Sequence, residues 1–158
     1  MNMFSLKKKD LNLYSPVSGL CKDITECEDP VFSKRMIGDG FFINPSESTV
    51  VAPCDGIIKS LFPTKHAFCI EKYDGKQIMV HVGLDTVKLK GKGFNANIKL
   101  GDKVQHGQPL VQFDQSYLKR EDVKLPVMVI LLEDYENHTK HHLGDVIDAN
   151  TLVMKGTT

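Results

Sequence analysis

Short apolar runs alternate with turn residues along most of the chain. The runs include VVAPCDGIIKSLF, HAFCIEKYDGKQIMVHV and PVMVILLED, and glycine, proline, aspartate or asparagine separates them. Many brief strands with such punctuation are typical of an all-β sandwich or barrel. We therefore expect an all-β fold, an antiparallel β-sandwich or barrel-sandwich hybrid with at most short helices. The pieces VVAPCDGIIKSLF and GDKVQHGQPLVQFD each fit a strand–turn–strand unit, as in hybrid domains.

Two segments favour helix over strand. Residues 132–144 (LEDYENHTKHHLG) have acidic side chains early, histidines late and Gly144 at the end, which is the pattern of a helix with a glycine stop. A turn of helix is also expected within residues 114–122. We expect residues 1–13 to be a flexible lead and residues 14–158 to form one domain.

The strongest local signal is a hairpin around Asp74-Gly75. Residues 66–71 and 77–82 are β-type runs, and Asp-Gly between such runs favours a two-residue turn. That turn predicts facing pairs of Tyr73 with Lys76, Ile70 with Met79, and Phe68 with His81. His66 and His81 then lie on one apolar face as diagonal neighbours, with Cβ atoms roughly 7–8 Å apart.

Composition narrows the classes of function. The 158 residues hold 20 basic and 20 acidic side chains, so nucleic acid is not favoured as a partner. There is no signal peptide and no run long enough for stable membrane insertion. The four cysteines form no C-x-x-C motif and fit the thiols of a reducing compartment. We expect a cytoplasmic protein, and the initiating methionine favours a free-standing one.

Histidine is the strongest candidate for chemistry, because neither a phosphate-binding glycine loop nor a G-x-S-x-G motif is present. Two imidazoles this close do not both charge easily, so at least one stays neutral near pH 7. A neutral ring nitrogen is a nucleophile toward a phosphoryl group, and the second ring can stabilise the phosphoryl oxygens. The Thr64 hydroxyl is placed to orient His66, and a backbone carbonyl near Gly83 or Asp85 to fix the tautomer of His81.

Several blocks resemble one known family. GDGFFINP, VVAPCDGIIKSLFPTKHAF and HVGLDTVKLKGKGF are similar to the glucose-type IIA domain of the bacterial phosphoenolpyruvate-dependent sugar phosphotransferase system. The T-x-HAF and HxGxDTVxLxGxGF blocks are specific, and the resemblance extends from Tyr14 to the C-terminus. It implies an antiparallel β-sandwich. We expect no cofactor, and no metal of the chain's own.

The resemblance also implies roles for individual residues. His81 would accept a phosphoryl group from the histidine phosphocarrier protein HPr and pass it to a cysteine of a IIB domain. His66 would hold the phosphoryl oxygens with Thr64 behind it, and the Gly83 carbonyl would hold the other nitrogen of His81. Asp29 and Asp85 match acidic positions where arginines of partner proteins dock. An apolar docking face would comprise Val31, Phe32, Met36, Ile37, Phe62, Met79 and Val87.

The resemblance implies regulatory partners as well, since family members control metabolic enzymes or transporters according to phosphorylation state. The chain departs from the family pattern at Lys88, where an acidic residue is common, and at Met79, where an aromatic is common. Apart from the resemblance, core burial explains Val31, Phe32 and Ile37 equally well, and Asp29 before Pro30 fits the start of a turn.

Three alternatives stay open. A zinc peptidase of lysostaphin-like architecture would use the H-x-x-x-D motif from His81 to Asp85, although the H-x-H of that class is missing. A regulatory binding module would use the same face without chemistry, and His66 and His81 would then hold a metal only in a site shared with a partner. His138, His141 and His142 have helical spacing that suits either a metal site or a solvated surface cluster.

Overall fold

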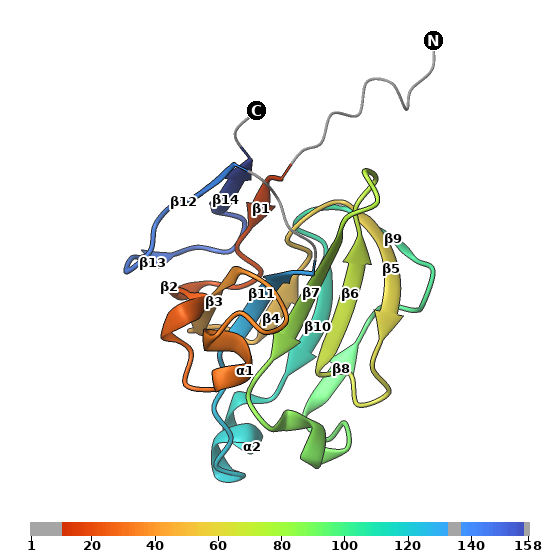
Figure 1. The fold of residues 1–158 in the computed structure, drawn as a ribbon. Coiled ribbons are helices and arrows are strands. Elements are labelled where there is room, and N and C mark those ends of the chain that lie inside the picture. The colour runs from red at the N-terminus through yellow and green to blue at the C-terminus, as the bar shows by residue number, and fades with distance from the viewer. Residues whose placement is uncertain (1–10, 133–136, 157–158) are drawn as a thin grey trace.

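A large antiparallel sheet organises the molecule. The computed structural model describes residues 11–132 and 137–156, and the expected all-β fold is confirmed there (Figure 1). The large sheet has eight strands in the spatial order β13 (Val146–Ile147), β2 (Gly19–Asp23), β3 (Gly40–Pro45), β11 (Val127–Leu131), β7 (Gln77–Val82), β6 (Ala67–Glu71), β5 (Gly56–Leu61) and β9 (Lys103–Val104).

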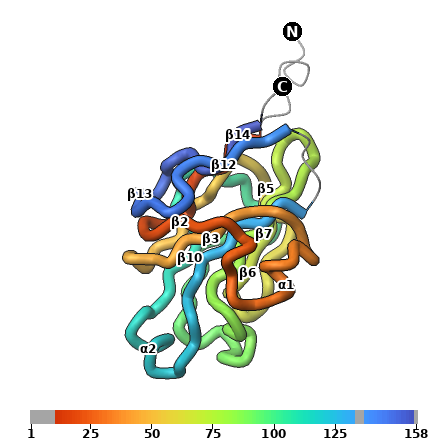
Figure 2. Tube along the Cα trace, turned by 60° about the vertical axis from the view of Figure 1, so that its left-hand side comes forward, coloured from red at the N-terminus to blue at the C-terminus, as the bar shows by residue number. Residues whose placement is uncertain are grey.

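Two smaller sheets complete the described fold. One has the order β4 (Thr49–Val51), β10 (Pro109–Phe113) and β8 (Phe94–Ala96), and the other has the order β1 (Leu13–Tyr14), β14 (Leu152–Gly156) and β12 (His138–Lys140). The main core lies between the large sheet and these two, because side chains of all three form one buried cluster, including Phe41, Phe68, Val111 and Met154. In both views, β12 and β14 lie at the opposite end of the molecule from α2 (Gln115–Arg120) (Figures 1 and 2).

The two strand–turn–strand pieces interlock. The first piece contributes β4 and β5, and the second contributes β9 and β10. Strand β4 pairs with β10, and β5 pairs with β9, in both cases antiparallel. Between these pairings, Ala52 N–H donates to the Gln108 carbonyl at 2.9 Å and Gly107 N–H donates to the Ala52 carbonyl at 2.9 Å. This crossed arrangement is that of the expected barrel-sandwich hybrid.

The predicted hairpin exists, but its predicted register is wrong by one residue. The loop holds three residues rather than two: the Lys72 N–H donates to the Lys76 carbonyl at 2.8 Å, and of the loop residues only Gly75 has positive φ, at 88°. The observed pairs are therefore Ala67 with His81, Phe68 with Val80, Cys69 with Met79, and Ile70 with Ile78. Phe68 and Ile70 consequently face the main core, on the opposite side of the sheet from Met79.

The helix expected over residues 132–144 is wrong in its described part. Residues 138–140 form strand β12, which pairs with β14, and residues 133–136 lie outside the described residues. The pairing with β14 outweighed a local helix pattern, as tertiary contacts often do. The turn of helix expected within residues 114–122 is confirmed as α2, where the Asp114 side chain accepts from the Tyr117 N–H at 3.0 Å.

The folded domain begins earlier than residue 14. Leu11 and Leu13 are buried in the main core, and Leu13 pairs with Met154. The predicted lead of residues 1–13 therefore extends too far, because Leu11 and Leu13 belong to the folded domain. Residues 1–10 lie outside the described part. A burial pattern on a two-residue strand is too short to recognise from alternation alone.

The outer face of the large sheet carries a separate, smaller core. A segment between β2 and β3, residues 24–38, crosses this face and is called the 24–38 loop below. It contains a 3-10 helix, η2 (Ile24–Glu26), and the one-turn helix α1 (Pro30–Ser33). Its buried side chains pack with those of the sheet in a second cluster: Ile24, Cys27, Phe32, Phe42, Cys69, Met79, Met128 and Ile130.

Candidate phosphohistidine site

Two histidine rings meet at the open end of the hairpin, where strand β6 begins and strand β7 ends. The ring centroids of His66 and His81 are 4.9 Å apart and the planes are inclined at 81°. His81 lies on β7, and His66 directly precedes β6, after Lys65 in the left-handed conformation at φ 61°. Strand alternation therefore does not set the direction of the His66 side chain, and the rings converge although the predicted register was wrong.

The surroundings of His66 fix its ring. The Thr64 hydroxyl lies 2.5 Å from His66 Nδ1, as the sequence predicted, and the ring of Phe62 stands edge-on at 5.4 Å. His66 is only 2% exposed. Burial lowers the pKa of His66 because a charged imidazolium loses its hydration there. Thr64 engages Nδ1, so Nε2 is the nitrogen of His66 that is left for a ligand.

His81 is half-buried, and its two nitrogens differ. Burial is the main cause that lowers the pKa of His81 to about 4, and the neighbouring His66 lowers it further. The backbone of Gly83 and the carboxylate of Asp29 act in the opposite direction on this pKa. Nδ1 of His81 is buried, and no hydrogen bond of ordinary geometry reaches it. The Gly83 backbone is nevertheless close enough to raise the pKa of the ring. Both imidazoles are consequently neutral at pH 7.

The turn after His81 requires a glycine. Gly83 has φ 81°, and a Cβ there would lie 2.4 Å from Thr86 Cγ2. Asp85 follows in the left-handed conformation at φ 58°, is exposed, and makes no side-chain cap to the 3-10 helix η3 (Thr86–Leu89). Asp29 has a structural task as well, because its carboxylate accepts from the Val31 N–H at 2.9 Å and caps α1. Both acidic residues thus lie at the start of short helices, Asp29 at α1 and Asp85 at η3.

The structure divides the seven predicted docking residues into an outer and an inner group. Four are exposed at their tips: Met36 at 70%, Val87 at 57%, Val31 at 41% and Phe62 at 39%. Phe32 and Met79 are buried in the second cluster, and Ile37 packs partly against it. The Phe32 ring also lies 5.2 Å from the His81 ring. Phe32 and Met79 therefore support the apolar surface from below and do not belong to its exposed part.

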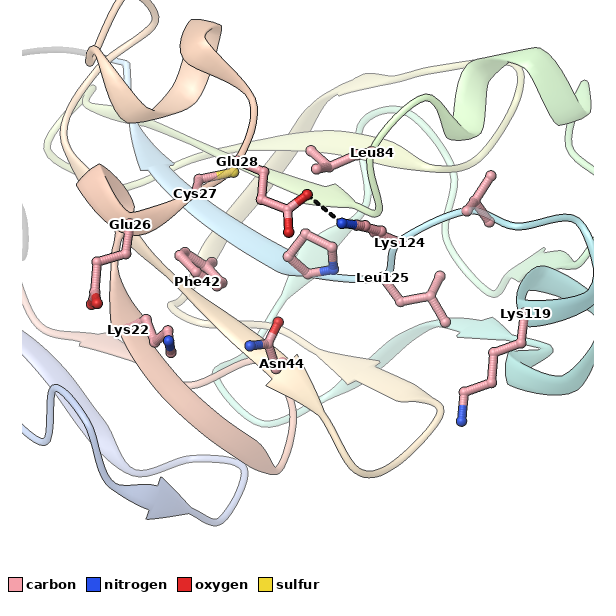
Figure 3. Close-up of a pocket in the computed structure, with 12 residues that line it drawn as sticks. Lys22, Glu26, Cys27, Glu28, Phe42, Asn44, Leu84, Lys119, Lys124 and Leu125 are labelled. Atoms are coloured by element: carbon pink, nitrogen blue, oxygen red, sulfur yellow. Dashed lines mark hydrogen bonds and ion pairs between the residues drawn. The ribbon is translucent and has the colours of Figure 1, made fainter.

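A pocket of about 450 Å³, lined by Phe42 among others, opens on the outer face of the large sheet (Figure 3). One row of paired residues runs across four adjacent strands: Lys22 pairs with Phe42, Phe42 with Met128, and Met128 with His81. Phe42, which lines the pocket, is therefore in the same cross-strand row as His81. An ion pair at 2.5 Å between Lys124 and Glu28 crosses the pocket. Sequence reasoning missed both residues, which are 96 positions apart and share no motif.

The other predicted histidine cluster does not form. His138 Nε2 lies 3.0 Å from Asp39, His141 Nε2 lies 3.1 Å from the Thr139 hydroxyl, and His142 Nδ1 lies 3.4 Å from Asp145. The three side chains diverge because the segment is a strand and a turn, where helical spacing has no meaning. Within residues 11–132 and 137–156, no three His, Cys, Asp or Glu side chains converge as a metal site would require.

None of the helices in the described part of the chain has the length and the apolar character needed to cross a membrane.

Comparison with known proteins gives one consistent result. Residues 11–137 match the family described as phosphoenolpyruvate-dependent sugar phosphotransferase system, EIIA 1. The chain is 38% identical over 150 residues to a glucose-specific EIIA component from Staphylococcus epidermidis, covering 95% of this chain and 87% of that protein. It is 44% identical over 143 residues to a glucoside-specific EIICBA component from Staphylococcus carnosus, covering 90% of this chain and 21% of that protein.

The fold agrees with the sequence relationship. The solved structure of glucose permease IIA from Mycoplasma capricolum matches with a TM-score of 0.85 at 34% identity, covering 94% of this chain and 96% of that one. Fold, family match and relatives all support a phosphocarrier, and not a zinc peptidase. The chain belongs to the EIIA 1 family of the phosphoenolpyruvate-dependent sugar phosphotransferase system.

Proposed function

We propose that His81 is the residue that carries the phosphoryl group, accepting it from phospho-HPr and passing it to a cysteine of a IIB domain. The observation that supports this role most directly is the asymmetry of the two histidines. His66 is 2% exposed, whereas His81 is half-buried with its Nδ1 sealed, so Nε2 of His81 is the nitrogen that a partner can approach.

The protonation state suits a nucleophile. Burial and the neighbouring His66 keep the pKa of His81 near 4, so the ring is neutral at physiological pH and the Nε2 lone pair is available. In the transfer, this lone pair forms the new P–N bond while the P–N bond of phospho-HPr breaks, and the electron pair of that bond returns to the donor imidazole. The proton on Nδ1 of His81 stays in place, and the nearby Gly83 carbonyl would accept its hydrogen bond as the ring gains positive character.

His66 supports the phosphoryl oxygens. The Thr64 hydroxyl at 2.5 Å from Nδ1 favours the tautomer with the proton on Nε2, provided that the hydroxyl donates. An Nε2–H held beside the reacting nitrogen is a preorganised donor for developing oxyanion charge, which is the most effective form of such stabilisation. The 4.9 Å separation of the ring centroids places this donor within reach of a group bonded to His81.

The surface around the histidines fits the docking of protein partners. Apolar side chains are exposed at Val31, Met36, Phe62 and Val87, and the Phe62 ring contacts the His66 ring. The negative charge of Asp29 acts on His81, and Asp85 is exposed two residues after Gly83. An apolar patch with a charged border is the common form of a protein interface. HPr and the IIB domain would use this surface in turn, with cations opposite the two aspartates. The four cysteines are free and buried, which is consistent with a protein that functions in the reducing cytoplasm.

Phosphorylation in a reconstituted system tests the proposal. Incubation with phosphoenolpyruvate, enzyme I and HPr should give an acid-labile, alkali-stable adduct on the wild-type chain, and His81→Ala should abolish it. His66→Ala should still accept the phosphoryl group but fail in transfer to the IIB domain.

The exposed His106 provides a matched control, since it lies outside the pair and His106→Ala should retain both steps. Label remaining on the His81→Ala chain would refute the assignment of the acceptor. Full onward transfer by His66→Ala would refute the role of His66 in that step and would leave the role of His81 unaffected.

A further inference from the structure

Lys140 makes two ion pairs over a long distance in the sequence. It is the last residue of β12, and its side chain is only 11% exposed. Its Nζ lies 2.5 Å from Asp23 Oδ1 and 2.7 Å from Asp39 Oδ1. One ammonium thus joins a strand of the small sheet β1-β14-β12 to two carboxylates that belong to the large sheet or to its border.

The two carboxylates mark the two ends of the 24–38 loop. Asp23 is the last residue of β2 and Asp39 directly precedes β3. Each carboxylate also binds the loop end itself: Asp23 accepts from the Thr25 hydroxyl at 2.5 Å, and Asp39 accepts from Arg35 Nε at 3.1 Å. Lys140 therefore closes the base of the loop, whose centre the second cluster holds through Ile24, Cys27 and Phe32.

The charges at this point depend on one another. Burial raises the pKa of both aspartates, but the hydrogen bond and charge of Lys140 lower it, together with hydrogen bonds from Thr25 to Asp23 and from His138 and Gly40 to Asp39. The pKa of Asp23 and of Asp39 therefore lies below the ordinary value. Without the ammonium, two carboxylates would face each other in a partly buried place. Asp39 would keep Arg35 and His138, whereas Asp23 would keep only Thr25 among its described partners. Removing one partner of a buried ion pair is far more disruptive than removing an exposed one.

We propose that Lys140 is a positioning residue for partner recognition: it fixes both ends of the 24–38 loop, and with them the placement of Asp29, Val31 and Met36 beside His81. This inference rests on the docking surface proposed above. Lys140 contacts neither histidine, and the pair is carried by the hairpin β6–β7, whose backbone ladder does not involve β12. Its loss should therefore weaken the encounter with a partner and leave the transfer step intact.

Two measurements on the full chain test the inference. In Lys140→Met, exchange of the α1 amides of Phe32, Ser33 and Lys34 should rise about tenfold, while amides of the β7–β11 ladder stay protected. The KM for phospho-HPr should rise about three- to tenfold, with kcat for phosphorylation of His81 changed by less than about twofold. Lys140→Arg keeps the charge and should restore most of the KM.

A matched control is Lys155→Met on the neighbouring strand β14, where the lysine is exposed and the same charge is removed. It should leave exchange and KM unchanged. If Lys140→Met does not fold, Asp23→Asn replaces it, and α1 exchange should again rise.

The outcomes separate this inference from the proposal on which it rests. Unchanged α1 exchange in a folded Lys140→Met chain would overturn the positioning role, whatever the kinetics. Faster α1 exchange with an unchanged KM would overturn the docking role of the loop, and with it the functional part of the inference. A fall in kcat with an unchanged KM would also overturn it.

Discussion

The β6–β7 hairpin is part of the large sheet, the 24–38 loop packs over the outer face of that sheet, and different forces hold the two. The hairpin sits near the middle of the eight-stranded sheet and is paired by backbone hydrogen bonds on both sides, to β5 and to β11. The loop has one 3-10 turn and one α-turn, and it depends on side chains: the caps of Asp23 and Asp29, the apolar cluster, and the ion pairs of Lys140.

Under the function proposed above, this difference separates chemistry from recognition. A reactive pair must keep one geometry, and a central strand pair is among the most protected elements of a protein. Partner recognition needs an exposed apolar surface, and a short, side-chain-held loop can present Val31 and Met36 without a sheet edge being opened. Substitutions in the two regions should therefore have different consequences, and each prediction below tests or sharpens that distinction.

The largest effect is expected from the hairpin core. Ile78 is fully buried in the main core, opposite Ile70. Ile78→Ala should lower the free energy of unfolding by about 2–5 kcal/mol, through lost burial and the cavity left behind. Chemical denaturation measures the loss, with Lys103→Ala at an exposed position of the edge strand β9 as a comparison of little expected effect. A loss under about 1 kcal/mol would mean that the hairpin is not the rigid element inferred here.

A charge on the exposed part of the docking surface should act on recognition alone. Met36→Lys should raise the KM for phospho-HPr about tenfold, equivalent to about 1.4 kcal/mol, because an interface centre tolerates an unpaired charge poorly. Leu100→Lys is the matched control, since Leu100 is 68% exposed and Met36 70%, but Leu100 lies near β9 at the far edge of the sheet. Equal effects of both substitutions would contradict a localised docking surface.

Loss of the Thr64 hydroxyl should affect transfer more than stability. Thr64→Val keeps the shape and removes a single hydrogen bond, which is worth about 1 kcal/mol, so onward transfer to the IIB domain should slow by about fivefold. Thr64→Ser should retain the rate. Rapid-quench measurement of phosphoryl loss from the carrier gives both numbers, and a wild-type rate for the valine variant would argue against orientation of His66 by Thr64.

Two variants of Asp29 distinguish its cap from its charge. Asp29→Ala should cost about 1 kcal/mol of stability through the lost cap on α1, while Asp29→Asn should keep most of it. Both should lower the pKa of His81 further, since the Asp29 charge favours the protonated ring. Denaturation and NMR titration of the imidazole measure these effects separately. A pKa change in the alanine variant alone would show that the cap, and not the charge, acts on His81.

The smallest effect on stability near neutral pH is expected from protonation of His81. The native pKa of His81 is about 4, below the ordinary value, so between these values the unfolded chain binds a proton that the native chain does not. The stability contributed by the neutral ring is complete above the ordinary histidine pKa of about 6.5 and is lost as pH falls toward 4. Denaturation at several pH values should show this decline, and His81→Gln should reduce it. An identical decline in both proteins would contradict the low pKa.

Prediction from sequence succeeded where a short motif determines the local structure. The strand-rich fold, the turn of helix at α2, and the contact of Thr64 with His66 all follow from residues close together in the chain. It failed at the hairpin register, because Asp-Gly supports both a two-residue turn and the observed three-residue turn, in which Asp74 caps Lys76 N–H at 2.9 Å. A shift of one residue moved Phe68 and Ile70 to the other face.

Contacts between distant segments could not be predicted at all. The helix pattern of residues 132–144 gave way to pairing of β12 with β14, a contact that only the folded chain creates. The ion pairs of Lys140 with Asp23 and of Lys124 with Glu28 span 117 and 96 positions, and no spacing rule connects them. The burial of Met79 likewise depends on the 24–38 loop folding over the sheet, whereas the burial of Phe32 agrees with the core alternative that the sequence left open.

Under the function proposed above, the buried Nδ1 of His81 restricts the order of events in the relay. With a single accessible nitrogen, loading and unloading must occur from the same side of the ring, at the same atom. In that relay the donor protein would have to leave before the acceptor arrives, because both need the same atom. The carrier would then work by alternation, as a shuttle that visits one partner and then the other.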